Sequence, residues 1–311
     1  MAKYVAITGG VGGAKLALGL SHILDPNQVA FVVNTGDDFE HLGLHISPDI
    51  DTLTYTLANR SNKEMGWGRQ GETWQFMQAL TELGGQTWFN LGDQDLALHV
   101  QRTLRLGEGV TLTEVTREIT TSLGVQHHIF PMTDNSVQTI VKTASGDLAF
   151  QHYFVRDQCE PTVTGFEFSG CEKAGLTQEV KDLIKDCSGV IICPSNPYVS
   201  VDPVLAVPGM REALKAASVP IVAITPIIAG AAIKGPTAKM MRELNVPVTS
   251  TQVAQHYQTL ISGFIYDHLD ADNHFDVAAI SAQTIMVSLQ DRIDLATTTL
   301  EFIQQLKGAS D

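Results

Sequence analysis

The fold is decided by residues 3–35, which read KYVAITGGVGGAKLALGLSHILDPNQVAFVVNT. Lys3–Thr8 is short, apolar and β-branched, which predicts a strand. Gly9–Gly13 then provides a turn, and Ala14–Leu20 is rich in residues that favour a helix. Val29–Thr35 is a second apolar run, of the kind found in parallel sheets that are covered on both faces. The segment therefore predicts a strand, a glycine turn, a helix and a parallel strand.

The same alternation continues along the chain and predicts an α/β fold with a doubly wound, Rossmann-like, mostly parallel sheet. The further strand candidates are Thr87–Leu91, Gly189–Cys193, Pro220–Thr225 and Gly263–Tyr266. The helical patterns are Gln70–Leu83, Thr177–Cys187 and the closing stretch Asp291–Leu306.

One stretch predicts a different arrangement. Val137–Thr143 and Leu148–Val155 flank the turn sequence ASGD, and Val163–Phe168 follows as a third strand candidate. We expect a small additional antiparallel subdomain at about residues 110–175, inside a single domain that spans residues 1–311.

The composition excludes several classes of protein. The chain of 311 residues is 44% hydrophobic and 17% charged, which argues against disorder and coiled coil. Its formal charge of −14 would repel a phosphate backbone, so general nucleic-acid binding is not expected. No apolar run reaches the ~20 residues of a membrane span, and residues 1–8 lack a targeting pattern. The four cysteines form no CxxC pair, and we expect reduced thiols and a cytoplasmic location without membrane contact.

The glycine turn is a candidate phosphate site. Gly10, Gly12 and Gly13 lie where such a fold presents backbone N–H groups and a helix N-terminus, and glycine permits close approach. The dinucleotide fingerprint is incomplete, because Lys15 stands where the third glycine is expected, and no P-loop sequence is present. A tight turn without a ligand is the alternative interpretation.

Carboxylates gather after the second strand. Asn34 is followed by Asp37 and Asp38, and a loop then leads to Asp49 and Asp51. Ligands bind at this edge of an open α/β sheet, and hard carboxylate oxygens suit Mg²⁺. We predict Asp37 and Asp49 as metal ligands, whereas Asp38 and Asp51 fit a solvated or helix-capping role equally well. One of these carboxylates could instead act as a general base toward a hydroxyl nucleophile.

Later strands also end in small or polar residues. Ser195 and Asn196 follow one strand candidate and Thr225 the next, where they leave room for a ring and supply amides and hydroxyls. Lys234 and Lys239 follow and are cations that could compensate a diphosphate, although Lys239 fits a solvated helix position equally well.

Two further residues are ambiguous. Asp93, after the Thr87–Leu91 strand candidate, could orient a substrate hydroxyl or a polar ring edge, while Asp95 could cap the next helix. Trp67 stands between two glycines and is either a mobile lid aromatic or a packed anchor.

With these motifs assembled, the sequence resembles the 2-phospho-L-lactate transferase family of the CofD and FbiA type over essentially the whole chain. The resemblance rests on TGGVGGAKL (8–16), NTGDDFEHLGLHISPDIDTLTYTLA (34–58), NLGDQDLALHV (90–100), MTDN (132–135) and ICPSNPYVSVDPVL (192–205). It implies transfer of a phospholactyl or phosphoenolpyruvyl group from a guanosine diphosphate-linked donor to the deazaflavin Fo, with release of GMP, in coenzyme F-420 biosynthesis. It also implies Mg²⁺ dependence and a homodimer.

The resemblance implies roles for individual residues. The metal ligands and catalytic carboxylates are Asp37 and Asp49, and the glycine turn with Asn34 and Lys15 serves phosphate or nucleotide. The guanosine is flanked by Ser195, Asn196 and the loop that begins at Thr225. The Fo side of the cleft is assigned to Asp93 and Asp134. Whether the donor is phospholactyl or enolpyruvyl stays open. The alternative function is a non-catalytic, nucleotide-sugar-binding regulator of the same superfamily.

Overall fold

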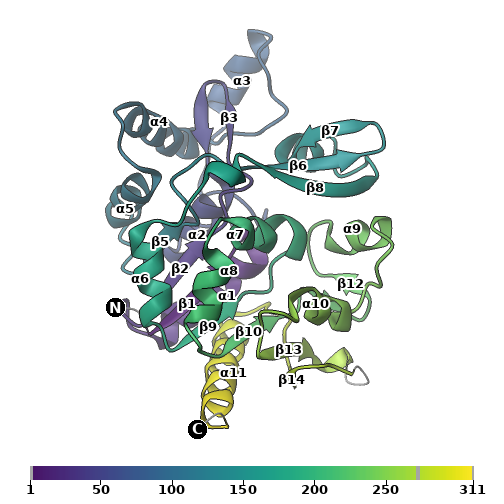
Figure 1. Ribbon diagram of the computed structural model, residues 1–311. Helices are drawn as coiled ribbons and strands as arrows, with labels where there is room; N and C mark the ends of the chain where they lie inside the picture. Colours follow the sequence, from purple (N-terminus) through teal and green to yellow (C-terminus); the bar gives the residue numbers. More distant parts are fainter. Residues whose placement is uncertain (1–2, 271–273, 310–311) are drawn as a thin grey trace.

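A parallel sheet forms the centre of the protein (Figure 1), which is described here by a computed structural model covering residues 3–270 and 274–309. Within those residues the strands, from one edge to the other, are β14 (Ala278–Ala282), β13 (Gly263–Asp267), β10 (Ile221–Ile224), β9 (Gly189–Ile192), β1 (Tyr4–Thr8), β2 (Val29–Val33) and β5 (His128–Pro131). All neighbours pair in parallel. The predicted doubly wound, Rossmann-like fold is confirmed.

The strand order reverses between β1 and β9, because the chain moves outward from β1 to β5 and then outward in the other direction from β9 to β14. The carboxyl ends of these two strands are therefore the topological switch point, where ligands bind in open α/β sheets. The loops that follow β1, β2, β9 and β10 all leave from this edge.

Two hydrophobic cores cover the two faces of the sheet, since alternate residues of each strand point to opposite sides. Val5 and Ile7 belong to one core, and Tyr4 and Ala6 to the other. The second core includes residues from α1 (Gly10–Ile23), α2 (Pro48–Leu57), α5 (Leu112–Ser122) and α11 (Leu289–Gly308). The first includes residues from α6 (Gln178–Asp186), α7 (Asp202–Ala206), α8 (Met210–Ala216), α9 (Thr237–Glu243) and α10 (Ser250–Tyr257).

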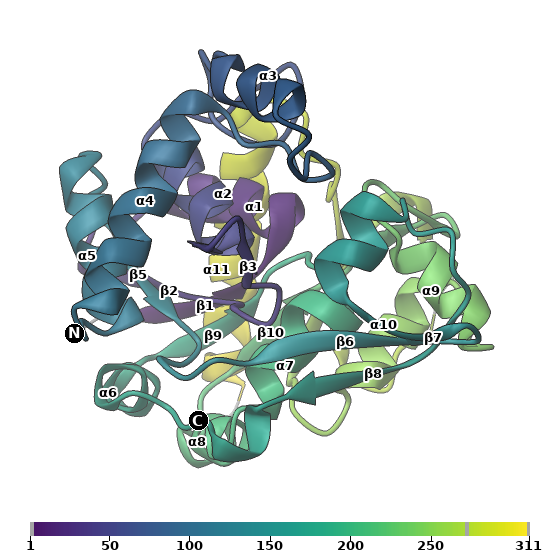
Figure 2. The ribbon, with the colours of Figure 1, turned by 90° about the horizontal axis from the view of Figure 1, so that it is seen from above.

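An antiparallel sheet stands apart from the central one, in the order β7 (Gly146–Ala149), β6 (Gln138–Thr143) and β8 (Val163–Ser169). Seen from above in Figure 2, it lies on one side of the molecule, with α4 (Asp93–Gly107) and α5 on the other. Helix α5 packs on β5 of the central sheet, and the strands of this three-stranded antiparallel sheet lie between Gln138 and Ser169.

The remaining elements are short. Small two-stranded sheets are formed by β3 (Phe39–His41) with β4 (Leu44–Ile46) and by β11 (Ile227–Ile228) with β12 (Ala231–Ala232). The other helices are α3 (Gln75–Glu82), the π-helical turns His152–Arg156 and Pro197–Val201, and the 3-10 turns Cys171–Lys173 and His268–Asp270.

The predicted strand Thr87–Leu91 was wrong. The segment connects α3 to α4 without strand pairing, and Phe89 and Leu91 instead pack with Ile46 and Met77 in a small separate core. The apolar side chains of this segment are buried in that core, so their burial does not require the segment to be a strand of the sheet. The predicted helix Gln70–Leu83 is also shorter, since α3 begins at Gln75.

The second predicted antiparallel strand, Leu148–Val155, was wrong beyond Ala149, where the chain turns helical. Phe150 and Phe154 stack with ring centroids 5.4 Å apart, and Tyr153 is buried. These spacings of three and four residues are helical, whereas a strand places every second residue on one face.

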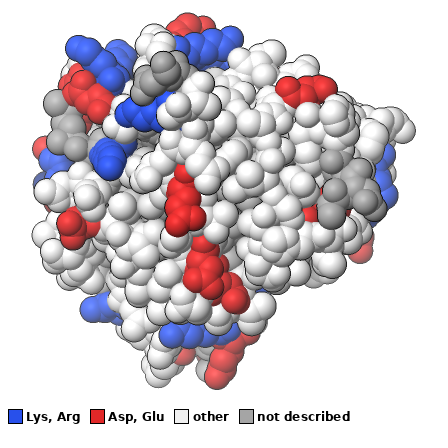
Figure 3. Space-filling model, turned by 90° about the horizontal axis from the view of Figure 1, so that it is seen from below, with Lys and Arg blue, Asp and Glu red and all other residues white. Residues whose placement is uncertain are grey.

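Charged side chains are dispersed on the face seen from below in Figure 3, where Lys and Arg alternate with Asp and Glu among larger uncharged areas. The acidic excess is therefore not gathered into one patch on that face. In residues 3–270 and 274–309, no helix combines the length and the apolar character that crossing a bilayer requires. Of the first eight residues, Met1 and Ala2 lie outside this described range.

Candidate functional site

The glycine turn after β1 is shaped by close packing against the loop that follows β9. A Cβ on Gly12 would lie 2.4 Å from the carbonyl oxygen of Pro194, and a Cβ on Gly13 would lie 2.1 Å from Thr8 Oγ1. Gly10 has a φ of +66°, which favours glycine, and a Cβ there would come no closer than 4.0 Å to Asp49 and Ser200. Close packing therefore requires glycine at Gly12 and Gly13, and the backbone conformation favours it at Gly10.

Ser195 holds the turn from the neighbouring strand. Its hydroxyl donates to the Gly9 carbonyl at 2.7 Å and lies 3.3 Å from the Gly9 N–H. Asn196 Oδ1 accepts from the Tyr198 N–H, and the Thr225 hydroxyl is bound within its own turn. The structure therefore brings Ser195 to the glycine turn, while the side chains of Asn196 and Thr225 fix the loops that follow β9 and β10.

Asn34 ties the two predicted metal carboxylates together. Its Nδ2 donates to Asp49 Oδ2 at 2.9 Å and lies 3.3 Å from Asp37 Oδ1. The Gly10 N–H donates to Asp49 Oδ1 at 2.6 Å, which connects the first turn of α2 to the glycine turn. Asp37 and Asp49 are only 6% and 7% exposed. The structure thus brings Gly10, Asn34, Asp37 and Asp49 together through hydrogen bonds.

Burial sets the charge state of these carboxyl groups. It raises the pKa of Asp49 to about 6, against the lowering effect of the hydrogen bonds from Asn34 and Gly10. The pKa of Asp37 is raised well above its ordinary value by burial, by Asp49 and by Asp38. Burial also raises the pKa of Asp38, whose Oδ1 is buried without a hydrogen-bond partner.

These residues fit a divalent cation. Two buried carboxyl groups whose pKa values are raised by burial and by neighbouring aspartates lack the positive charge that would stabilise their ionised forms. Oxygen donors of this kind are the ligands of Mg²⁺ in phosphate-handling sites. Asp37 and Asp49 are the residues that would hold it.

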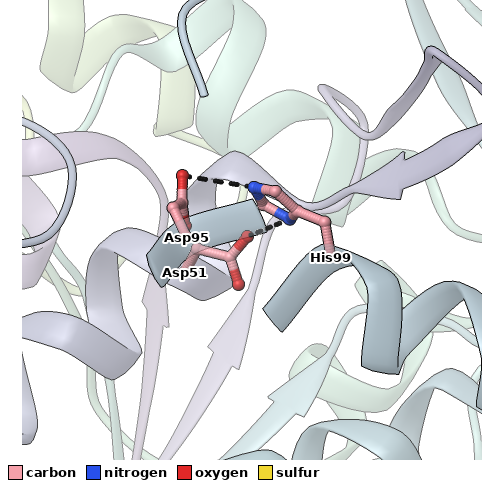
Figure 4. A group of neighbouring side chains, drawn as sticks. All are labelled: Asp51, Asp95 and His99. Atoms are coloured by element: carbon pink, nitrogen blue, oxygen red, sulfur yellow. Dashed lines mark ion pairs between the residues drawn. The ribbon is translucent and has the colours of Figure 1, made fainter. Parts of the chain in front are cut away.

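A second group, of two aspartates and a histidine, is formed by side chains of α2 and α4. Asp51, Asp95 and His99 converge in Figure 4, with His99 Nε2 3.2 Å from Asp95 and His99 Nδ1 3.7 Å from Asp51. Arg102, which is 1% exposed, binds both oxygens of Asp51, and Tyr55 donates its hydroxyl to Asp95. The guanidinium already neutralises Asp51, so this group is a buried ion-pair network.

The two aspartates expected on the acceptor side cap helices in the structure. Asp93 accepts from the Gln75 and Phe76 N–H groups at the start of α3. Asp134 is exposed and accepts from the Thr113 N–H at the start of α5. Neither contacts Asp37 or Asp49, so the structure does not join them to the carboxylate pair.

An aromatic cluster adjoins Asp37 instead. The Trp88 ring lies 5.0 Å from His41 and 4.8 Å from His152, measured between ring centroids. The residue before His152, Gln151, points its Nε2 to the carbonyl oxygen and to Oδ2 of Asp37, at 3.4 Å each. Sequence reasoning missed this cluster because its members come from three distant segments, and two of those segments were predicted as strands.

Lys15 and Trp67 have distinct surroundings. Lys15 Nζ donates to the Met286 carbonyl at 2.8 Å, just before α11. Trp67 is 45% exposed and stands between two glycines of positive φ, so its ring is not a packed anchor in this structure.

Known proteins resemble this chain along nearly its whole length. A family profile described as 2-phospho-L-lactate transferase CofD matches residues 4–293. A 2-phospho-L-lactate transferase from Methanosarcina mazei is 33% identical, covering 96% of this chain and 99% of the relative. A phosphoenolpyruvate transferase from Kitasatospora aureofaciens is 35% identical, covering 99% and 100%. A solved structure of a UPF0052-family protein from Bacillus halodurans aligns with a TM-score of 0.61 at 15% identity, over 96% and 99%, which shows the shared fold alone.

Proposed function

The chain belongs to the CofD family of 2-phospho-L-lactate transferases, and from this membership we propose that it transfers a phospholactyl or phosphoenolpyruvyl group to the deazaflavin Fo. The donor is guanosine diphosphate-linked, GMP is the second product, and the step belongs to coenzyme F-420 biosynthesis. The observation that carries the proposal is the buried pair Asp37 and Asp49, joined by Asn34 beside the glycine turn. The pair lies at the switch point, where such a fold binds its ligands.

The reaction displaces GMP from a diphosphate. The terminal ribityl hydroxyl of Fo attacks the distal phosphorus, a new P–O bond forms to that oxygen, and the bond from phosphorus to the GMP oxygen breaks. Mg²⁺, held by Asp37 and Asp49, supplies charge compensation on the diphosphate when it is bound. The protein's own contribution is to position the two substrates and to receive the hydroxyl proton.

Asp37 Oδ2 is the oxygen that we assign to that proton. Its one hydrogen bond among the described residues is the long one from Gln151 Nε2, at 3.4 Å, which leaves this oxygen free to accept a proton. Gln151 also connects Asp37 to the aromatic cluster of His41, Trp88 and His152. We therefore place the flat deazaflavin ring against Trp88, which replaces Asp93 and Asp134 as the acceptor side in this proposal.

A 2-phospho-L-lactate transferase and a phosphoenolpyruvate transferase match this chain at similar sequence identity, 33% and 35%. The sequence identity therefore does not distinguish between the two donors. The two donors differ in the substituents of one small carbon unit, which is worth about 1–3 kcal/mol in a pocket. The preferred donor is the one with the higher kcat/KM when both are offered.

Ligand binding tests the proposal. A ligand that binds the native state raises the apparent melting temperature, so Fo and GDP with Mg²⁺ should each raise it, whereas UDP-N-acetylglucosamine should not. Trp88→Ala should lose the shift with Fo and keep the shift with GDP. Trp74→Ala, which removes another partly exposed tryptophan, is the matched control and should keep both. A response to the UDP-sugar alone would support the regulator alternative and reject the transferase.

We also propose a cytoplasmic homodimer. Sedimentation equilibrium of the purified chain, with and without GDP, tests the oligomeric state, and fractionation of the producing cells tests the location.

A further inference from the structure

A side-chain hydrogen bond closes the base of the β3–β4 hairpin, which lies in the sequence between the two predicted metal ligands. Directly beyond the last residue pair of this hairpin, the Ser47 hydroxyl donates to Asp38 Oδ2 at 2.7 Å. Asp38 follows Asp37 in the chain, and Ser47 precedes Asp49 by two residues. The bond therefore joins the segment that carries Asp37 to the start of the helix that carries Asp49.

Helix α4 holds the same hairpin in place. His45 Nε2 lies 3.1 Å from Asp38 Oδ2, so this oxygen has a second partner from the hairpin. The His45 N–H donates to Thr103 Oγ1 of α4 at 2.8 Å. One residue earlier in α4, Arg102 binds both oxygens of Asp51, in the first turn of α2. The hairpin and the start of α2 are thus both attached to α4.

The first turn of α2 is held on two sides. Side chains two residues apart on a helix point about 200° apart. Asp49 accepts from the Gly10 N–H, and Asp51 is bound by Arg102. Asn34 joins Asp49 to Asp37 directly, and the Ser47–Asp38 bond restrains the backbone segments from which the two carboxylates extend.

The Ser47 hydroxyl makes this bond instead of the one that is usual at a helix start. Ser47 is the residue before α2, yet its side chain makes no capping hydrogen bond to that helix. Thr111, Thr177, Thr249 and Ser288 hold the same position before α5, α6, α10 and α11, and each accepts from a backbone N–H of the first turn. Because a capping bond stabilises a helix, α2 gives up that contribution while its hydroxyl binds Asp38.

The bound carboxylate is itself costly to bury. Asp38 is only 9% exposed and Ser47 is fully buried. Asp38 Oδ1 is buried without a hydrogen-bond partner among the residues that the structure describes. An uncapped helix start and an unpaired carboxylate oxygen both reduce stability, and folds accept such costs chiefly at functional sites.

We propose that Ser47 is a positioning residue for the cation site, because its bond to Asp38 holds the Asp37 segment in place against the first turn of α2. This inference rests on the proposed function, which assigns Mg²⁺ to Asp37 and Asp49. Mg²⁺ is demanding in the arrangement of its ligands, so a restraint on the two segments lowers the cost of ordering them when the cation binds.

The test measures the dissociation constant of Mg²⁺ alone by calorimetry, and the Mg²⁺ concentration that gives half-maximal turnover. Ser47→Ala removes the hydroxyl, and Ser47→Thr keeps one. His45→Ala removes the other partner of the same Asp38 oxygen at a more exposed position, and it replaces Ser47→Ala as the test if that variant does not fold. Ser288→Ala is the matched control, because it removes a serine hydroxyl that caps α11.

Ser47→Ala should raise the dissociation constant of Mg²⁺ about tenfold, since a hydrogen bond to a charged group contributes about that factor. Half-maximal turnover should need correspondingly more Mg²⁺, while most of kcat returns at saturating Mg²⁺. Ser47→Thr should restore binding, and His45→Ala should weaken it by a smaller factor. Ser288→Ala should lower the denaturant midpoint and leave the Mg²⁺ dependence unchanged, as a merely structural hydroxyl would.

Unchanged Mg²⁺ binding in folded Ser47→Ala, or in His45→Ala where it is the test, would overturn the inference. A wild type that binds no Mg²⁺ would overturn it together with the metal assignment. A transfer assay separates these failures from that of the proposed function. Product formation with an unchanged Mg²⁺ dependence in the variants rejects the positioning role alone. Mg²⁺ binding that Ser47→Ala weakens, in a wild type that makes no product, keeps the positioning role and rejects the transferase.

Discussion

At the scale of single residues, Asn34 determines how the two carboxylates are held. One amide nitrogen faces an oxygen of Asp37 and an oxygen of Asp49, and the amide oxygen accepts from the Gly36 N–H. The amide fixes both carboxylates but carries no charge, so it leaves their negative charge uncompensated. Such an arrangement costs stability in the metal-free protein and favours a cation that binds there.

Replacing Asp37 by Asn should separate activity from stability. The neutral amide removes a carboxyl group whose ionised form is disfavoured by burial and by Asp49, so the variant without metal should be more stable than the wild type. Loss of a metal ligand should lower kcat at least about 100-fold. Thermal unfolding in EDTA and steady-state turnover measure the two effects. Asp186→Asn, at an exposed position, should change neither.

The raised pKa of Asp49 predicts a dependence of stability on pH. The folded value is about 6 against an ordinary 3.8, so the folded state binds more protons between about pH 4 and pH 6. The contribution of this group to the free energy of unfolding is therefore present at low pH and lost as pH rises through about 6, by about 3 kcal/mol.

Urea unfolding in EDTA measures this contribution as the difference between the wild type and Asp49→Asn at each pH. The wild type should lose stability relative to the variant from pH 4 to pH 6, and Mg²⁺ should restore it at pH 7.5. Parallel curves for the two proteins would show that Asp49 titrates normally.

The sequence predicted the charged centre but not the roles of every aspartate. Asn34, Asp37 and Asp49 follow one apolar strand within a few residues or one short loop, and that proximity is visible in the sequence. Asp93 and Asp134 cap α3 and α5, whose first turns lie far from them in sequence. A carboxylate that caps a distant helix looks the same in a sequence as one that binds a substrate.

At the scale of elements, the turn between β1 and α1 depends on glycine at Gly12. An alanine there would place its Cβ 2.4 Å from the Pro194 carbonyl oxygen, which belongs to the backbone and cannot rotate away. The clash outweighs the gain in helix propensity, so Gly12→Ala should destabilise the protein by about 1–3 kcal/mol.

Chemical unfolding measures this change, with Gly107→Ala as the control. Gly107 is also helical, and a Cβ there meets nothing within 4 Å, so that variant should be as stable as the wild type or more stable by up to about 1 kcal/mol. Equal effects of the two substitutions would argue against the close approach of the two loops.

Helices α2 and α4 are joined by the ion pair between Asp51 and Arg102. Arg102→Met would leave Asp51 buried and uncompensated, which should cost about 3–5 kcal/mol. Arg105→Met, one turn further along α4, breaks exposed pairs with Glu108 and Glu118 and should cost less than about 1 kcal/mol. Denaturant midpoints compare the two, and a small loss for Arg102→Met would mean that the network contributes little.

The type of an element could be predicted where the burial of its faces produces a recognisable sequence pattern. The buried strands β1, β2, β9 and β10 are continuous apolar runs, and the sequence indicated each of them. Thr87–Leu91 has the same character and is not a strand, because a small separate core buries it. The local pattern of apolar residues shows that a segment is buried. The elements that pack against it are determined by the tertiary fold.

At the scale of the whole molecule, the strand order brings separate motifs to one edge. The glycine turn, the Asn34 loop and the Ser195 loop follow β1, β2 and β9, which are adjacent in the sheet. A sequence shows the motifs in order but not the crossing that makes β1 and β9 neighbours.

The central claim is that this arrangement transfers a group to Fo with the help of a metal. The most direct measurement incubates the purified protein with Fo, Mg²⁺ and either guanylylated donor, and follows GMP and the Fo phosphodiester by mass spectrometry, with EDTA in a parallel reaction. We predict both products in equal amounts with Mg²⁺ and neither with EDTA. Absence of product with both donors, in a protein that still binds UDP-sugars, would contradict the account.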